Sequence, residues 1–294
     1  MTTVTRGWRV VLLLWVVALT ATALAVSATF TQVVAEPDHF PRGTVITGWL
    51  IVGGSLLLVL ASPAFALSQR TALRQPSPSR RAAVVRAWLN ACRLVAWFVV
   101  GLAAACLATV PLGGVSLIRL VLGPLAVLVV LAFVLAIQVG IVASSRRTWS
   151  AVLATILAAV VLVLAPPVVA GFFEVATDKT VPEPDGWNST LDTYPSWFVV
   201  AADPLVIIAD ATPWVLVDDP SRSSEPMANG LDPLVVISGT ARYWRRDDAT
   251  KQKQAWTGWS LDDASRWPVV WPYGLALLGA LGALSLAVGA RRLS

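Results

Sequence analysis

The chain has 294 residues, of which 56% are hydrophobic and only 13% are charged, and its mean hydropathy is +0.72. A soluble domain carries about twice that share of charge, so the composition excludes a soluble globular protein and indicates an integral membrane protein. The net charge of +5 and the pI near 9.8 do not indicate nucleic-acid binding, because membrane proteins acquire basic loops for topological reasons.

Six apolar runs reach the length of roughly 20 residues that an α-helix needs to cross a bilayer. They cover residues 10–34, 45–67, 94–112, 120–143, 149–173 and 268–290. The first run is too long for the core of a signal peptide and ends without a small-x-small cleavage pattern, so we interpret it as a span. The sequence therefore predicts an all-α integral membrane protein with six transmembrane helices.

The distribution of charge predicts the orientation of these helices, because Lys and Arg accumulate in short cytoplasmic loops. With both termini in the cytoplasm, the inner segments carry 12 arginines and no acidic residue, whereas 15 of the 17 acidic residues lie between Glu174 and Asp263. We expect a multi-pass protein of the cell (inner) membrane in three parts. These are residues 1–173 with five spans, an extracytoplasmic segment of short helices and loops at 174–267, and residues 268–294 with the sixth span and a cytoplasmic tail.

The predicted cytoplasmic loop at residues 68–93 contains six arginines and no acid. It divides into "SQRTALRQ", a "PSPS" break and "RRAAVVRAWLNACR", and the last stretch is expected to form a helix that enters the third span. This helix would display Arg81 and Arg86 to lipid headgroups or to a protein, and its apolar face would consist of Ala82, Val85, Leu89 and Cys92. Two roles remain open: a topology-fixing loop that touches anionic lipid, and a docking site for a cytosolic partner.

In the outer segment, "DPLVIIADATP" from Asp203 and "DPLVVISGTARYW" from Asp232 resemble each other. Asp followed by Pro is typical of a helix start, because the carboxylate caps free amides and Pro at the first position gives up no needed donor. We expect short helices that pack on the outer face of the bundle, the first ending before Pro213. The many tryptophans of this segment favour an aromatic belt at the headgroups, with an aromatic ligand cleft as the alternative.

The sequence contains no recognisable catalytic constellation, so we predict that the chain is not an enzyme and has no catalytic residues, no metal site and no cofactor of its own. His39 has no second ligand nearby, and no P-loop pattern occurs. The paired carboxylates at 218–219, 247–248 and 262–263 are interpreted as solvated surface charge rather than cation sites. The six spans lack Asp, Glu, Lys and His; Arg119 is expected to snorkel at a membrane end, and Gln138 is the strongest polar group at depth.

Four stretches carry a family resemblance: "LVLASPAFALSQRTAL", the region from "PLGGVSLIRL" to "SAVLATILAAV", "ADPLVIIADATP" and "WPYGLALLGALGALSLAVGARRLS". In this order, with a large outer segment before the last span, they are similar to the permease subunits of ABC-2 type ABC transporters, particularly actinobacterial ones. The resemblance implies a membrane-spanning permease subunit of an ATP-driven exporter. Its partners would be a second permease subunit, as a homodimer or heterodimer, and cytosolic ABC ATPase subunits that bind ATP and Mg²⁺.

In this family the loop between the second and third spans carries the coupling helix. Carried over to this sequence, the coupling residues are Arg70, Arg74, Arg80, Arg81 and Arg86. The alternative function is that of a non-transporting membrane protein whose outer segment binds an envelope partner or another subunit. A secondary carrier or membrane enzyme is disfavoured, because the spans are nearly uncharged and no catalytic constellation is present.

Overall fold

The computed structural model describes residues 42–75, 79–177, 179–183, 186–190, 197–214, 216–217, 227–228, 232–245 and 267–292, together with positions 11, 14, 15, 17–23 and 25. The first predicted span, at 10–34, falls mostly outside the described residues, although those of its positions that are described are helical. His39 and the carboxylate pairs at 218–219, 247–248 and 262–263 also lie outside them.

Five of the described helices are long and apolar enough to cross a membrane. They are α2 (Arg42–Leu67), α4 (Arg80–Leu107), α5 (Leu117–Ser144), α6 (Thr148–Thr177) and α12 (Trp271–Arg292). Each overlaps one of the predicted spans, so five of the six are confirmed as long apolar helices. Together they indicate a multi-pass membrane protein.

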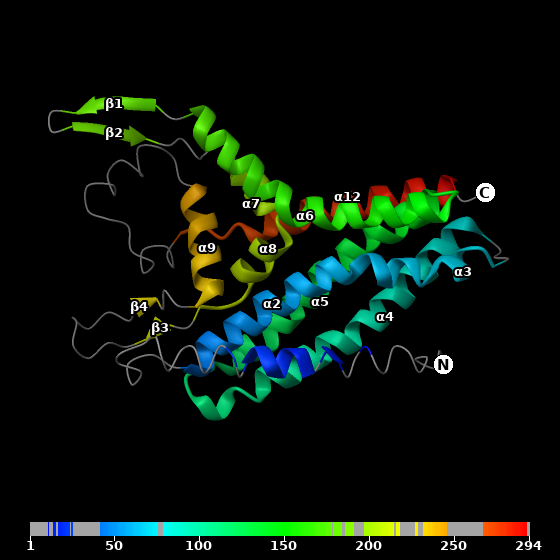
Figure 1. The fold of residues 1–294 in the computed structure, drawn as a ribbon, viewed down its shortest axis with the longest axis horizontal. Coiled ribbons are helices and arrows are strands. Elements are labelled where there is room, and N and C mark those ends of the chain that lie inside the picture. Colours follow the sequence, from blue (N-terminus) through cyan, green and yellow to red (C-terminus); the bar gives the residue numbers. More distant parts are fainter. Residues whose placement is uncertain are drawn as a thin grey trace.

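Helix α5 lies in the middle of the bundle, where it contacts α2, α4, α6 and α12 (Figure 1). Its contact with α12 is close, because a Cβ atom on Gly289 would lie 2.9 Å from the carbonyl oxygen of Gly140. Ser285 Oγ of α12 also donates a hydrogen bond to Ile137 O at 2.9 Å. Small residues at helix contacts let backbones approach each other, which favours helix association in lipid, where the hydrophobic effect contributes little.

The turn between α4 and α5 is short. A single 3₁₀ turn, η2 (Val110–Leu112), is followed by Gly113 and Gly114 with φ of 86° and 75°. Two consecutive residues in the left-handed region favour glycine, because a Cβ would strain the backbone there. The glycine pair thus allows the chain to reverse within a few residues.

The basic loop folds as two helices rather than as an extended linker. After α2 comes the four-residue α3 (Arg70–Leu73), and α4 begins at Arg80 with the Ser79 side chain accepting a hydrogen bond from Ala82 N at 3.1 Å. The predicted helix into the third span is confirmed, and Arg81 and Arg86 are exposed. The predicted apolar face is wrong: Val85 and Leu89 are 43% and 42% exposed, and the buried face consists of Ala83, Val84, Ala87 and Ala91.

The segment between α6 and α12 forms short elements at the end of the bundle opposite α3 (Figure 1). Its helices are α7 (Trp197–Ala201), α8 (Pro204–Ala211) and α9 (Pro233–Trp244). Helix α8 contacts α5 and α12, and α9 contacts α2, so the predicted short helices do pack on the bundle. Both Asp-Pro starts are confirmed, since Asp203 and Asp232 accept hydrogen bonds from Leu205 N and Leu234 N, and α8 ends before Pro213 as expected.

Two short antiparallel hairpins in the same segment were not predicted, so the expectation of helices and loops alone is incomplete. Strands β1 (Lys179–Glu183) and β2 (Gly186–Thr190) pair with Val181 opposite Asn188, and β3 (Leu216–Val217) pairs with β4 (Met227–Ala228). Pro184 and Asp185 separate β1 from β2, which begins with Gly186, and Pro, Asp and Gly are typical of tight turns. This turn chemistry explains the first hairpin within a segment whose other elements are helical.

Candidate functional site

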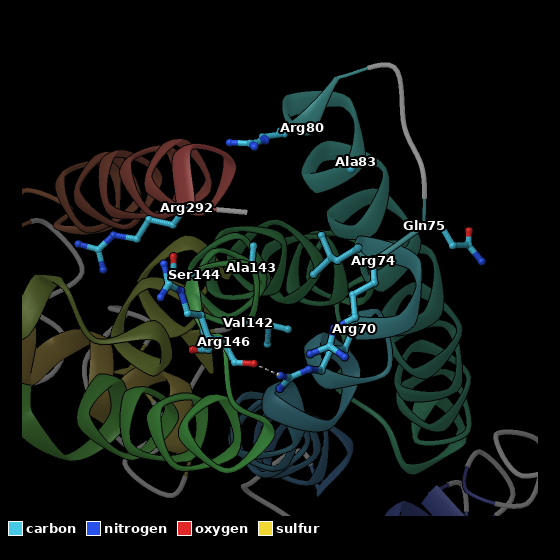
Figure 2. A pocket seen from close by; sticks show the side chains of 12 residues that line it. Arg70, Arg74, Gln75, Arg80, Ala83, Val142, Ala143, Ser144, Arg146 and Arg292 are labelled. Atoms are coloured by element: carbon cyan, nitrogen blue, oxygen red, sulfur yellow. Dashed lines mark hydrogen bonds between the residues drawn. The ribbon is translucent and has the colours of Figure 1, made fainter. Parts of the chain in front are cut away.

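A hollow at the α3 end of the bundle has a volume of about 430 Å³. Four segments surround it: α3 with the turn after it, the start of α4, the end of α5 with the following turn, and the end of α12. The lining residues are Arg70, Leu73, Arg74, Gln75, Arg80, Ala83, Val142, Ala143, Ser144, Ser145, Arg146 and Arg292. Figure 2 shows this basic pocket with Arg146 and Arg292 on one side and Arg70 and Arg74 across from them.

Arg70 joins two of the segments that surround the basic pocket. Its terminal nitrogens donate hydrogen bonds to the carbonyl oxygens of Arg146 and Arg147, at 3.0 and 3.3 Å (Figure 2). Charge-assisted hydrogen bonds of this kind are stronger than neutral ones. Arg70 therefore connects α3 to the turn between α5 and α6, 76 residues away in the sequence.

The charge of the basic pocket is entirely positive, since five of its lining residues are arginines and none is acidic. Among the described residues, the guanidinium groups of Arg74, Arg80, Arg146 and Arg292 have no hydrogen-bond or ion-pair partner. Each guanidinium offers five N–H donors in a planar fork that matches carboxylate and phosphate oxygens. The arrangement can bind an anionic group, because like charges held around one hollow repel each other until a negative charge enters.

Three of the five predicted coupling residues, Arg70, Arg74 and Arg80, line the basic pocket, and Arg81 and Arg86 do not. The structure adds Arg146 and Arg292, which sequence reasoning assigned to the cytoplasmic side without proposing them as site residues. The sequence did indicate that these two arginines lie on the same side, because the pairs Arg146–Arg147 and Arg291–Arg292 each stand at the end of an apolar run expected to finish there. Segment ends on one side of a bundle can meet, although the sequence does not say which of them do.

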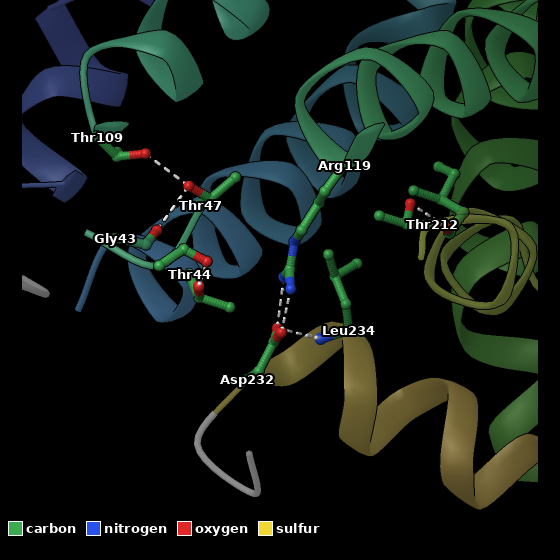
Figure 3. A network of polar contacts seen from close by, with 10 residues as sticks. Gly43, Thr44, Thr47, Thr109, Arg119, Thr212, Asp232 and Leu234 are labelled. Carbon is green, nitrogen blue, oxygen red and sulfur yellow. Dashed lines mark hydrogen bonds and ion pairs between the residues drawn. The ribbon is translucent and has the colours of Figure 1, made fainter. Parts of the chain in front are cut away.

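A second polar centre lies at the opposite end of the bundle. The Arg119 guanidinium of α5 forms a bidentate pair with Asp232, with Nη1–Oδ2 and Nη2–Oδ1 distances of 2.5 and 2.8 Å (Figure 3). Both side chains are fully buried. The expectation that Arg119 snorkels to the membrane surface is therefore wrong: it is retained inside the protein because a carboxylate from the outer segment reaches it.

Hydroxyl groups beside this ion pair connect the ends of α2 and α4. The Thr47 and Thr109 hydroxyls lie 2.6 Å apart, and each also lies within hydrogen-bond distance of a carbonyl oxygen of its own segment, Gly43 O or Cys106 O (Figure 3). Since each hydroxyl has one hydrogen, one of the two donates to the other and the second donates to its carbonyl. Buried polar groups are costly unless they are hydrogen-bonded, so the contact between the two hydroxyls stabilises the packing of the start of α2 against the end of α4.

Asp210, the second buried carboxylate, joins α8, α9 and the start of α12. It accepts hydrogen bonds from Ser238 Oγ at 2.6 Å and Arg242 Nε at 2.5 Å, and from the backbone amides of Val270 and Trp271 at 2.5 and 2.9 Å. With four donors the carboxylate is well satisfied despite its burial. Two buried carboxylates thus bind the outer segment to the spans: Asp232 pairs with Arg119 of α5, and Asp210 accepts from the start of α12.

Three aromatic residues, two of the outer segment and one of α12, stack on arginines. The Arg245 guanidinium lies 5.2 Å from the Trp197 ring centre and 4.7 Å from that of Tyr273, and Arg242 lies 4.8 Å from that of Trp214. Cation–π contacts at these distances are attractive. These described rings therefore serve packing, and the alternative of an aromatic ligand cleft receives no support from them.

Asp203, at the start of α8, is expected to make stability depend on pH. Burial raises the pKa of its carboxyl from 3.8 to about 7, although the backbone amides of Leu205 and Val206 oppose the shift. Because the pKa is raised on folding, the stabilisation is complete below about pH 4 and is lost as the pH rises to 7. Wild-type protein should therefore melt at a higher temperature at pH 5 than at pH 8, with a free-energy difference of about 2–3 kcal/mol at most.

The matched variant is Asp203→Asn, which can still accept from Leu205 N but does not titrate. Tryptophan fluorescence melts of both proteins in detergent at a series of pH values measure the effect. The difference between the two proteins should grow from pH 4 to pH 7 and then stay constant. Equal pH dependence in both proteins would show that Asp203 is not the titrating group.

Three residues within the described spans have buried polar atoms without a hydrogen-bond partner: both amide atoms of Gln138 and Nε of Arg119 in α5, and the hydroxyl of Ser62 in α2. Gln138 is fully buried inside the bundle. Cys106 is buried and Cys92 is half-buried, and neither forms a disulfide. No three His, Cys, Asp or Glu side chains gather as metal ligands within the part of the chain that the structure describes.

Comparison with protein-family models, with curated proteins and with solved structures finds no match for this chain. The functional argument therefore depends on the residues of the chain itself and on their arrangement.

Proposed function

We propose that the chain is the membrane-spanning permease subunit of an ATP-driven exporter in the cell membrane, with cytosolic ATPase subunits docking on the basic end of its bundle. One observation carries the proposal: arginines from α3, α4, the α5–α6 turn and α12 gather at one end of the bundle without an acidic residue among the lining of the hollow they surround. A basic surface of this kind complements an acidic groove on a partner. The short α3, between two long spans, is the element that would enter such a groove.

The proposed orientation places this basic end in the cytoplasm and residues 174–267 outside, with both termini inside and six spans in total. The arginine-rich end and the end that contains Asp210 and Asp232 lie at opposite sides of the described bundle (Figure 1). This separation agrees with the preference of arginine for the cytoplasmic side. The homodimer or heterodimer that the family resemblance implies belongs to the same proposal.

The nearly uncharged spans support a transporter that takes its energy from a partner subunit. Within the apolar parts of the five described spans, with α6 taken as far as Phe172, there is no Asp, Glu, Lys or His; Glu174 lies beyond that part, near the end of α6. Arg119, the charged residue within α5, is paired with Asp232. A carrier coupled to protons or ions needs ionisable groups at depth that change their charge state. ATP hydrolysis on separate subunits, with binding of Mg²⁺ there, would supply the driving force instead.

Co-purification tests the docking proposal. The chain is expressed with an ABC ATPase encoded beside its gene, and wild type is compared with a variant in which Arg70, Arg74, Arg80, Arg81 and Arg86 are all changed to Gln. We expect the ATPase to remain bound to wild type in detergent and to detach from the Gln variant. The matched control changes the same five residues to Lys, which retains the charge and should retain most of the binding.

The outcomes separate the candidate functions. If the Gln variant inserts, elutes as a single species and still retains the ATPase, docking does not use these arginines. If no ABC ATPase is encoded nearby, or if it binds neither form, the exporter proposal fails. The outer segment, fastened to the spans through Asp210 and Asp232, would then be the surface to test for an envelope partner, as expected of a non-transporting accessory protein.

A further inference from the structure

We propose that the basic pocket is a binding site for a phosphate ester, the group shared by lipid headgroups and soluble phosphorylated metabolites. The inference concerns a ligand of the chain itself and does not depend on the docking of an ATPase. The pocket of about 430 Å³ falls within the range of roughly 300–1,000 Å³ typical of small-ligand sites. It can therefore hold a phosphate together with the organic group attached to it.

The donors of the basic pocket suit phosphate oxygens. Arg74, Arg80, Arg146 and Arg292 line it, and among the described residues none of their four guanidinium groups has another partner. Figure 2 shows Arg74 across the hollow from Arg146 and Arg292, with Arg80 above them, so the arginines that surround the hollow come from α4, α12 and the two turns. Guanidinium and phosphate form bidentate, charge-assisted hydrogen bonds, which are among the stronger polar contacts in proteins.

Arg70 has a different role, because its terminal nitrogens are already engaged with two carbonyl oxygens. It holds the α5–α6 turn in place and so positions Arg146 at the rim of the pocket. Its charge still adds to the positive potential inside the hollow. Arg70 is therefore a positioning residue, and the binding variants described below leave it unchanged.

Part of the pocket lining is apolar. Leu73, Ala83, Val142 and Ala143 contribute to it, and all four side chains are buried. Val142 and Ala143 belong to the last turn of α5, where an apolar span meets the charged end of the bundle. A hollow with guanidiniums and apolar side chains at such a boundary fits a phosphate ester better than a bare inorganic ion, because the ester also presents carbon atoms.

The pocket variant changes Arg74, Arg80 and Arg146 to Gln. The chain provides a matched control, in which Arg81, Arg86 and Arg291 are changed to Gln; these residues lie near the same end but do not line the pocket. Both variants remove three positive charges, so a general attraction of anions to a basic surface would weaken equally in both. All six arginines are exposed, so neither variant should prevent folding.

Two probes distinguish the sources of the phosphate ester. The purified full chain is placed in phosphatidylcholine nanodiscs without any ATPase, and glycerol phosphate is titrated by calorimetry. In parallel, native mass spectrometry counts phosphatidylglycerol molecules retained after delipidation. We expect wild type and the control variant to bind at least one of the probes with affinities within about twofold of each other, and the pocket variant to bind about tenfold or more weakly.

Binding of the soluble ester would identify a phosphorylated metabolite as the ligand class, whereas retention of the lipid alone would identify a headgroup. The site is rejected if wild type binds neither probe, or if the pocket and control variants lose equal affinity. Because the ATPase is absent, failure here leaves the docking proposal unaffected. Failure of co-purification likewise leaves the phosphate site standing.

Discussion

The Asp232→Asn variant should unfold with a free energy about 3 kcal/mol lower than wild type, because it leaves the Arg119 guanidinium buried without a counter-charge. Asparagine retains an oxygen that can accept the hydrogen bond from Leu234 N, so the cap of α9 is maintained. The loss of stability therefore reports the missing negative charge. Asp232→Ala should cost about 1 kcal/mol more, since it removes the cap as well. Denaturant titrations in detergent, followed by tryptophan fluorescence, measure these differences.

The double variant Arg119→Met/Asp232→Leu is the matched control for this pair. It removes both charges and fills the site with apolar side chains of similar size, and replacements of this kind for a buried ion pair can be neutral or stabilising. We expect the double variant to be more stable than either Asp232→Asn or Arg119→Met alone. Additive losses in the double variant would contradict the idea that an unpaired buried charge dominates the cost.

Gly48→Ala should also destabilise the protein strongly. A Cβ atom on Gly48 would collide with Asp232 Oδ1 and would lie 2.9 Å from Arg119 Nη2 and 3.0 Å from Pro233 Cδ. The added methyl group must therefore displace a buried ion pair, the start of α9 or α2 itself. Overpacking of this kind costs about 1–3 kcal/mol, and disturbance of the ion pair would add to it.

Gly53→Ala provides the control on the same helix, since no atom lies within 4 Å of the position of its Cβ. This variant should be neutral or slightly stabilising, because Ala favours helix by up to about 1 kcal/mol over Gly. Thermal melts of the two variants in one detergent give the comparison. Equal melting temperatures would mean that α2 and α9 are not in close contact at Gly48.

Features encoded by local sequence could be predicted from it. Span lengths follow from continuous apolar runs, and the starts of α8 and α9 follow from Asp-Pro, whose capping chemistry involves only neighbouring residues. The helix at the beginning of α4 follows from the Ser79 cap and the residues after it. In each case the stabilising contact lies within a few positions of the signal.

Features that depend on distant residues could not be predicted. Arg119 and Asp232 are 113 positions apart, and nothing local selects Asp232 from the many carboxylates of the outer segment. The face of α4 was assigned wrongly because larger apolar residues were expected to be buried. In a membrane bundle the small residues pack against other helices, as Ala87 and Ala91 do here, and larger ones such as Leu89 can face lipid.

Helix α12 contributes to both polar ends of the molecule. Its first residue, Trp271, donates to Asp210 at the outer end, and its last, Arg292, lines the basic pocket. A helix of 22 residues behaves as a rod about 33 Å long, and α5 supports it along its length. A ligand that pulled Arg292 inward would tilt this rod, and the Asp210 carboxylate would carry the tilt to α8 and α9, so the two polar ends of the bundle would be mechanically linked through a single helix.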